Sequence, residues 1–348
     1  MRVAWVESRL AVMNVRGIVW LAMACGSLAA TGQGAPAGKS GGSADFKLVL
    51  ANHNGQIQWK ASGYKITETS AKPDGREIGI RAQDASGRLN FLGFLFQVPE
   101  QAPLTSAKCK DGSLEQEKAN DPTYKQTRMS EVARTDKVPV SVVDYSVQGK
   151  GGSPAYSVRG FIASGDLCGD LEIYSTDPIR SEDPELLQIF QSFELDEHYQ
   201  PGFNDVLFYA QILFNSRQYA AAGPLFERAL TLARDVKGVD TKLWRRLATD
   251  QAGMSYGMSG DTNKARAIFE AAIANDPDYP MYYYNLACAD AQEKNLADAR
   301  KHLQQAFDRR VNTLPGERMP DPTTDDSFTP YSNDKDFSSF LEGLRAKR

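Results

Sequence analysis

Histidine and cysteine are scarce in this sequence. Its 348 residues include three histidines and four cysteines, with no C-x-x-C pair and no metal-ligand spacing among the histidines. We therefore expect no metal site and no cofactor. An excess of one charge is also missing, because 40 lysines and arginines face 44 aspartates and glutamates. A mildly acidic chain lacks the positive field that holds nucleic acid, so a nucleic-acid partner is excluded.

The N-terminal apolar stretch is too short for a permanent membrane helix, which takes about 20 residues. Residues 17–30 form this stretch, after Arg16 and before small residues rich in Gly, Ser and Ala. A basic start, a short apolar core and small residues are typical of an export signal. We predict a signal peptide and flexible linker over residues 1–43, and a protein of the bacterial periplasm or cell envelope.

Cys25 has two interpretations. The sequence Leu21-Ala-Met-Ala-Cys25 partly resembles a bacterial lipobox, which implies a lipid anchor on Cys25. Met23 departs from that pattern. The alternative is a cysteine without a role inside a removed signal. Any membrane association is expected only through this anchor.

Residues 44–199 alternate apolar and polar side chains at a period near two, with turn residues between the runs. The predicted elements are strands at 76–84, 89–98, 138–147, 155–163 and 167–175, a helix at 184–193 and a short strand at 193–195. Ser181 is the expected N-cap of the helix. The pattern indicates an α+β domain, an antiparallel sheet with covering helices. It loosely resembles PsbP/Mog1-like domains, which implies a non-catalytic accessory role.

Cys109 and Cys168 are the two cysteines of this region. Two thiols in one exported domain usually pair, so a structural disulfide is the favoured interpretation. Two buried free thiols and a redox site are the alternatives. Asp166 and Asp170 flank Cys168, and we expect them to cap backbone N–H groups at a turn rather than to hold a cation.

The C-terminal part repeats itself. Ala265 and Ala299, Phe269 and Leu303, Ala272 and Ala306, and Gly253 and Ala287 are each 34 residues apart. An earlier copy carries Ala222, Phe226 and Ala229 at the same internal spacing. Small and bulky residues alternating on a helix let neighbouring helices approach closely and share a core.

This repeat resembles the tetratricopeptide repeat (TPR) in its period and in its small and bulky positions. The resemblance implies three helical hairpins over residues 200–313, forming an all-α solenoid after the α+β domain. A Pro-rich segment and a capping helix are predicted over 314–348, with a detachable partner-binding helix as the alternative.

The TPR resemblance also implies a concave groove lined by first-helix side chains. The candidate partner-binding residues are Phe208, Gln211, Asp250, Gln251, Met254, Met258, Tyr284 and Asn285. They are apolar, amide and thioether groups with one acid and no Lys or Arg, so a protein or peptide of apolar or mixed character is expected rather than an acidic tail. Packing of several of these residues against the rest of the chain is the alternative.

The sequence as a whole indicates a non-catalytic protein–protein adaptor of the cell envelope. The alternative is an exported accessory protein whose N-terminal domain holds a small molecule or lipid. An enzyme is not expected, because the scattered histidines form no recognisable nucleophile, base and orienting group.

Overall fold

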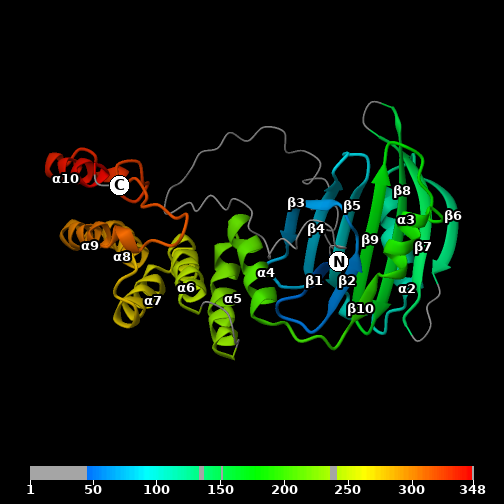
Figure 1. Ribbon diagram of the computed structural model, residues 1–348, viewed down its shortest axis with the longest axis horizontal. Helices are drawn as coiled ribbons and strands as arrows, with labels where there is room; N and C mark the ends of the chain where they lie inside the picture. Colours follow the sequence, from blue (N-terminus) through cyan, green and yellow to red (C-terminus); the bar gives the residue numbers. More distant parts are fainter. Residues whose placement is uncertain (1–44, 133–136, 150–151, 236–240, 347–348) are drawn as a thin grey trace. The chain divides into compact units, whose positions relative to one another are not determined.

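The computed structural model describes residues 45–132, 137–149, 152–235 and 241–346 (Figure 1). Within these ranges the chain forms two compact units, which meet in sequence between residues 272 and 273. We call residues 45–272 the first unit and residues 273–346 the second unit. The predicted signal segment and Cys25 lie outside the described residues, and the domain boundaries predicted at 43/44, 199/200 and 313/314 stay predictions.

Two antiparallel sheets form the N-terminal part of the first unit (Figure 1). One has the strand order β1-β2-β10 and the other β3-β4-β5-β9-β8-β7-β6. The strands are β1 Asp45–Val49, β2 Gln56–Lys60, β3 Tyr64–Ala71, β4 Glu77–Asp84, β5 Asn90–Gln97, β6 Lys125–Val132, β7 Val140–Gln148, β8 Pro154–Ser164, β9 Leu167–Ser175 and β10 Glu194–Asp196. The predicted α+β class of this part is confirmed, and the predicted strands correspond to β4, β5, β7, β8, β9 and β10.

The larger sheet has two different faces, because successive side chains of a strand point in opposite directions. Leu171 and Ile173 of β9 belong to the main hydrophobic core. On this face Trp59 of β2 packs edge-to-face on Phe91, with ring centroids 5.5 Å apart. A Cβ on Gly93 would lie 2.5 Å from the Trp59 ring, so only glycine permits this packing.

Helix α2, Ser106–Asn120, covers β7, β8 and β9 on the opposite face. Helix α3, Pro184–Gln191, is the predicted helix, but the expected N-cap is wrong. Asp183 takes the N-cap position, and the backbone N and Oγ of Ser181 both lie 3.1 Å from Asp144 Oδ2. Ser181 therefore ties its loop to β7 instead of capping α3.

Helices follow in the order that the repeat predicts. The first unit contains α4 Phe203–Asn215, α5 Tyr219–Leu232, α6 Thr241–Met258 and most of α7 Thr262–Asn275. In α5 the predicted small and bulky residues, Ala222, Phe226 and Ala229, are fully buried. A Cβ on Gly253 of α6 would lie 2.3 Å from the Phe269 ring of α7, which explains the glycine at this repeat position.

The first helical hairpin is fixed to the sheets. The Tyr209 hydroxyl of α4 lies 2.8 Å from the carbonyl oxygens of both Lys72 and Glu77, beside the β3–β4 turn. Lys47 of β1 forms an ion pair with Asp205 of α4 at 2.6 Å. One hydrophobic core continues from the sheets into α4, α5 and α6. The change from strands to helices therefore falls inside a single compact unit.

The second unit contains α8 Pro280–Gln292, α9 Leu296–Asp308 and α10 Lys335–Arg345, with short 3₁₀ turns at Arg310–Asn312 and Thr329–Tyr331. Helix α10 is the predicted amphipathic C-terminal helix. The Asp334 side chain caps it by accepting a hydrogen bond from the backbone N of Phe337. Phe337, Leu341 and Leu344 of this helix are buried.

Candidate protein-binding surface

Helices α4 and α6 carry six of the eight predicted groove residues, and five of these six form one face. Phe208 and Gln211 are one turn apart on α4, and Gln251, Met254 and Met258 recur at one-turn spacing on α6. This spacing places each set on one side of its helix. The two helices are in contact. We call these five residues the α4–α6 face.

The α4–α6 face combines apolar and amide groups. Met258 is 40% exposed, whereas Met254 is 8% exposed. Phe208, Gln211 and Gln251 are half-buried, and Phe208 packs against the main core. The Gln251 Oε1 atom has no hydrogen-bond partner among the residues that the structure describes. That oxygen is itself buried, so the groups that the face offers to a partner are an adaptable thioether, an aromatic ring and the half-buried Gln211 amide.

Asp250 is a less accessible candidate. It lies on α6 beside Gln251, but its residue is only 4% exposed. Burial keeps the carboxylate away from a surface partner. Asp250 therefore does not add a charge to the α4–α6 face.

Tyr284 and Asn285 lie on α8 in the second unit and are also buried, at 0% and 4% exposure. A single stretch of the C-terminal region covers Tyr284. We call residues 317–331 the C-terminal segment. The Tyr284 hydroxyl donates a hydrogen bond to Asp325 Oδ2 at 2.9 Å, and the Phe328 ring meets the Tyr284 ring edge-to-face. The chain itself therefore occupies this predicted position.

The C-terminal segment follows α8 in the same direction. The hydroxyl of Tyr279, before the first turn of α8, donates to Glu317 Oε1 at 2.7 Å. Near the end of the helix, the Tyr331 hydroxyl donates to the Ala291 carbonyl oxygen at 2.5 Å. The Asp325 contact lies between these two. This segment was predicted only as a Pro-rich stretch and not as a ligand of α8, although its acidic, proline and aromatic residues are visible in the sequence.

Asp325 is an unusual carboxyl group in this contact. Burial raises its pKa above the ordinary value of 3.8, while hydrogen bonds from the Ser327 backbone and the Tyr284 hydroxyl oppose that shift. The nearby Asp326 charge adds to the increase. The folded state thus binds a proton at Asp325 more tightly than the unfolded chain does.

We expect the stability of the second unit to depend on pH through Asp325. A raised folded-state pKa stabilises the protein at low pH, and this contribution is lost as the pH rises through the folded pKa, upward from 3.8. The measurement is Tm against pH for the native chain and Asp325→Asn. The Tm difference between native and variant should fall as the pH rises. Asp326→Asn, at the exposed neighbour, should show a much smaller change, and a pH-independent difference for Asp325→Asn contradicts the assignment.

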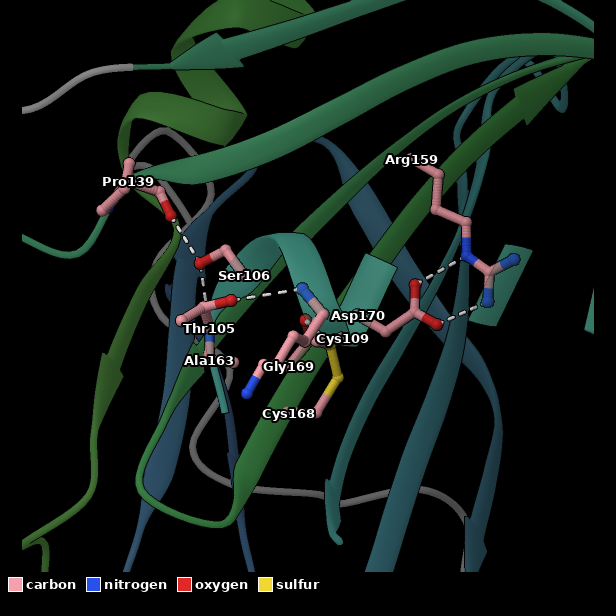
Figure 2. The surroundings of a disulfide bond; sticks show 10 residues. Thr105, Ser106, Cys109, Pro139, Arg159, Ala163, Cys168, Gly169 and Asp170 are labelled. Carbon is pink, nitrogen blue, oxygen red and sulfur yellow. Dashed lines mark hydrogen bonds and ion pairs between the residues drawn. A yellow bond between two sulfur atoms is a disulfide. The ribbon is translucent and has the colours of Figure 1, made fainter. Parts of the chain in front are cut away.

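Cys109 of α2 and Cys168 of β9 form a disulfide with Cα atoms 5.9 Å apart (Figure 2). Both residues are at most 5% exposed. Because the bond is buried where α2 joins β9, the structural role is favoured over the redox alternative. Ser106 strengthens the same junction, because its Oγ donates to the Pro139 carbonyl and accepts from the Ala163 backbone N.

The expectation that Asp170 caps a turn is wrong. Asp170 lies inside β9 and forms a two-pronged ion pair with Arg159 of β8, at 2.8 and 2.5 Å (Figure 2). Both residues are 1% exposed. Burial opposes the charged form of Arg159, but the Asp170 carboxylate raises the arginine pKa well above its ordinary value. Glu117 of α2 adds a longer contact at 3.3 Å.

Asp166, in contrast, does lie at the turn between β8 and β9. It accepts a hydrogen bond from Gln97 at 2.6 Å and lies 3.3 Å from His53. In the second unit, His302 lies 2.6 Å from the buried Asp290. Across the described ranges, no group of three or more His, Cys, Asp or Glu side chains is placed to hold a metal ion.

None of the helices in the described part of the chain has the length and apolar character to cross a bilayer. Cys25 lies outside the described residues, so its lipidation stays a prediction from the sequence.

No protein-family model and no curated protein matches the chain. Solved structures with partial likeness include the translocator chaperone SycD of Yersinia enterocolitica, 18% identical over 44% of this chain and 98% of that chain, with a TM-score of 0.29. The Sgt2 TPR domain of Aspergillus fumigatus is 18% identical over 42% of this chain and 80% of that chain, with a TM-score of 0.29. The PsbP protein of Synechocystis sp. PCC 6803 is 7% identical over 46% of this chain and 97% of that chain, with a TM-score of 0.32. With scores this low, the likeness assigns no activity to this chain.

Proposed function

We propose that the chain is a non-catalytic adaptor of the bacterial cell envelope, which binds a protein or peptide of apolar or mixed character on the α4–α6 face. The observation that carries the proposal is the exposed Met258 beside half-buried amide and aromatic groups on helices fixed to a shared core. A prepositioned surface loses little conformational entropy when a partner binds. Thioether and aromatic groups supply apolar contact, and the glutamine amides supply hydrogen bonds.

The envelope part of the proposal rests on two features. Residues 1–43 have the order of an export signal. The Cys109–Cys168 disulfide fits an oxidising compartment outside the cytoplasm. N-terminal mass spectrometry of the protein from its own host tests this idea. The mature chain should begin between residues 25 and 44, with an acylated Cys25 if the anchor exists; an intact N-terminus contradicts export.

The adaptor role is tested by a crosslinking pull-down from the host envelope with Met258→Glu. A buried charge at the contact is costly, so the partner captured by the native protein should be lost. Because Met258 is exposed, the substitution should leave the fold intact, which circular dichroism checks.

Met129→Glu is the matched control. Met129 lies on β6 in the same unit, is 51% exposed and receives the same change of charge. It should keep the partner. Equal capture by both variants would contradict the α4–α6 face as the binding surface. No partner at all, together with a small molecule retained in native mass spectrometry, would favour the ligand-carrier alternative.

A further inference from the structure

The C-terminal segment covers the side of α8 that the TPR resemblance assigns to partner binding. Its contacts reach Tyr284 and Ala291, which are seven residues apart and therefore on one side of the helix. Cys288 lies between them at spacings of four and three residues, and all three are at most 4% exposed. The cover is part of the same unit and the same chain.

The segment meets α8 through one compact turn. The Phe328 backbone N donates to the Asp325 carbonyl at 2.9 Å, and the Ser327 backbone N donates to Asp325 Oδ1 at 2.9 Å. This turn presents the Asp325 carboxylate and the Phe328 ring together to Tyr284. Phe328 is 1% exposed, whereas Asp326, which follows Asp325 in the sequence, is exposed. The recognition element is therefore an acidic residue followed three positions later by an aromatic one.

The hydrogen-bond donor to the Asp325 carboxylate is the Tyr284 hydroxyl rather than a lysine or arginine. The lack of basic residues in the predicted groove led us to expect no acidic ligand. Tyr284 changes that conclusion for α8, since its hydroxyl donates to the carboxylate and its ring packs on the phenylalanine. A tyrosine provides both contacts at once.

We propose that the C-terminal segment is an internal ligand of α8, and that an external acidic peptide with an Asp-x-x-Phe turn binds the same side of α8 in its place. The proposal rests on the adaptor function and extends it to a second surface. An internal ligand lowers the apparent affinity for an external one by the fraction of molecules in which the site is open. Weakening the segment should therefore strengthen binding of the external peptide.

The test uses the full chain and a fluorescent peptide with the sequence of residues 317–331. Phe328→Ala in the chain removes the buried ring of the internal ligand, and the peptide should bind this variant roughly tenfold or more tightly than the native chain. A peptide with both Asp325→Ala and Phe328→Ala should lose that binding. Asp326→Asn in the chain, at the exposed neighbour, should bind the peptide as weakly as the native chain does.

Thiol labelling of Cys288 gives a second readout. Cys288 is the cysteine of the described residues that forms no disulfide, and it is buried. N-ethylmaleimide should label it faster in Phe328→Ala than in the native chain, and the peptide should slow that labelling again. Mass spectrometry of the fragment that contains Cys288 separates this signal from other thiols. If Phe328→Ala disturbs the fold, Asp325→Ala replaces it, because it removes the hydrogen bond to Tyr284, and it should show the same direction of change.

Equal peptide affinity for the native and weakened chains would overturn the proposal, and so would faster Cys288 labelling without peptide binding. Neither result depends on Met258. A partner that Met258→Glu loses while the peptide test fails would leave the adaptor function standing. If the peptide binds as expected but Met258→Glu still captures the partner, partner recognition would instead lie on α8 alone.

Discussion

Replacing Asp170 with alanine should lower the free energy of unfolding of the first unit by about 3–5 kcal/mol. The change leaves the Arg159 guanidinium buried, with the longer Glu117 contact at 3.3 Å as its remaining ion pair among the described residues. An uncompensated charge in a dry interior is expensive, whereas the pair itself contributes little relative to apolar groups of similar size. The loss therefore measures the cost of the orphaned charge.

Urea unfolding followed by tryptophan fluorescence measures this loss. In a chain without residues 1–43, the tryptophans are Trp59 and Trp244, and both belong to the first unit. The double variant Arg159→Met with Asp170→Leu should recover most of the lost stability. Arg128→Ala, which breaks an exposed ion pair with Glu182, should cost less than about 1 kcal/mol. An Asp170→Ala protein as stable as Arg128→Ala would show that the buried pair is not needed.

Removing the disulfide should destabilise the first unit by a similar amount. The bond joins residues 59 positions apart, and closing a loop of that length restricts the unfolded chain by about 4 kcal/mol in the chain-entropy model. Cys109→Ser with Cys168→Ser should therefore unfold at lower urea concentration than the oxidised protein. The same tryptophan signal reports the transition.

The matched control is the native protein with a reducing agent, which should behave like the double variant. Adding the reductant to the double variant should then change nothing. Mass spectrometry of the unreduced mature protein should show a peptide that joins residues 109 and 168. Absence of that peptide, or an unfolding curve unaffected by the double substitution, would favour the alternative of two buried free thiols.

The sequence predicts the helical repeat because its signal is local and periodic. Ala222, Phe226 and Ala229 recur at helical spacing, and each is buried where the repeat requires it. Helix α10 is predicted for the same reason. The strands around β9 are visible through their alternation, although alternation does not identify what covers each face.

Helix α2 could not be predicted in this way. It buries Ser106, Cys109, Lys110 and Leu114, a mixed set that forms no apolar stripe. Its position depends on the disulfide and on bonds to distant strands. Asp170 was misinterpreted for a related reason, because its partner Arg159 is brought close only by the register of β8 and β9. The Tyr284 contact with Asp325 joins residues 41 positions apart, a pairing that no local pattern contains.

The central claim, that the α4–α6 face binds a partner, is tested most directly by photocrosslinking from position 258. A photoreactive phenylalanine analogue replaces Met258 in one chain and Met129 in another, and both are irradiated in the host envelope. We expect one crosslinked protein from position 258 that is missing from position 129 and is lost when Phe208→Ala is added. Identical crosslinks from both positions, or none from position 258, would contradict it.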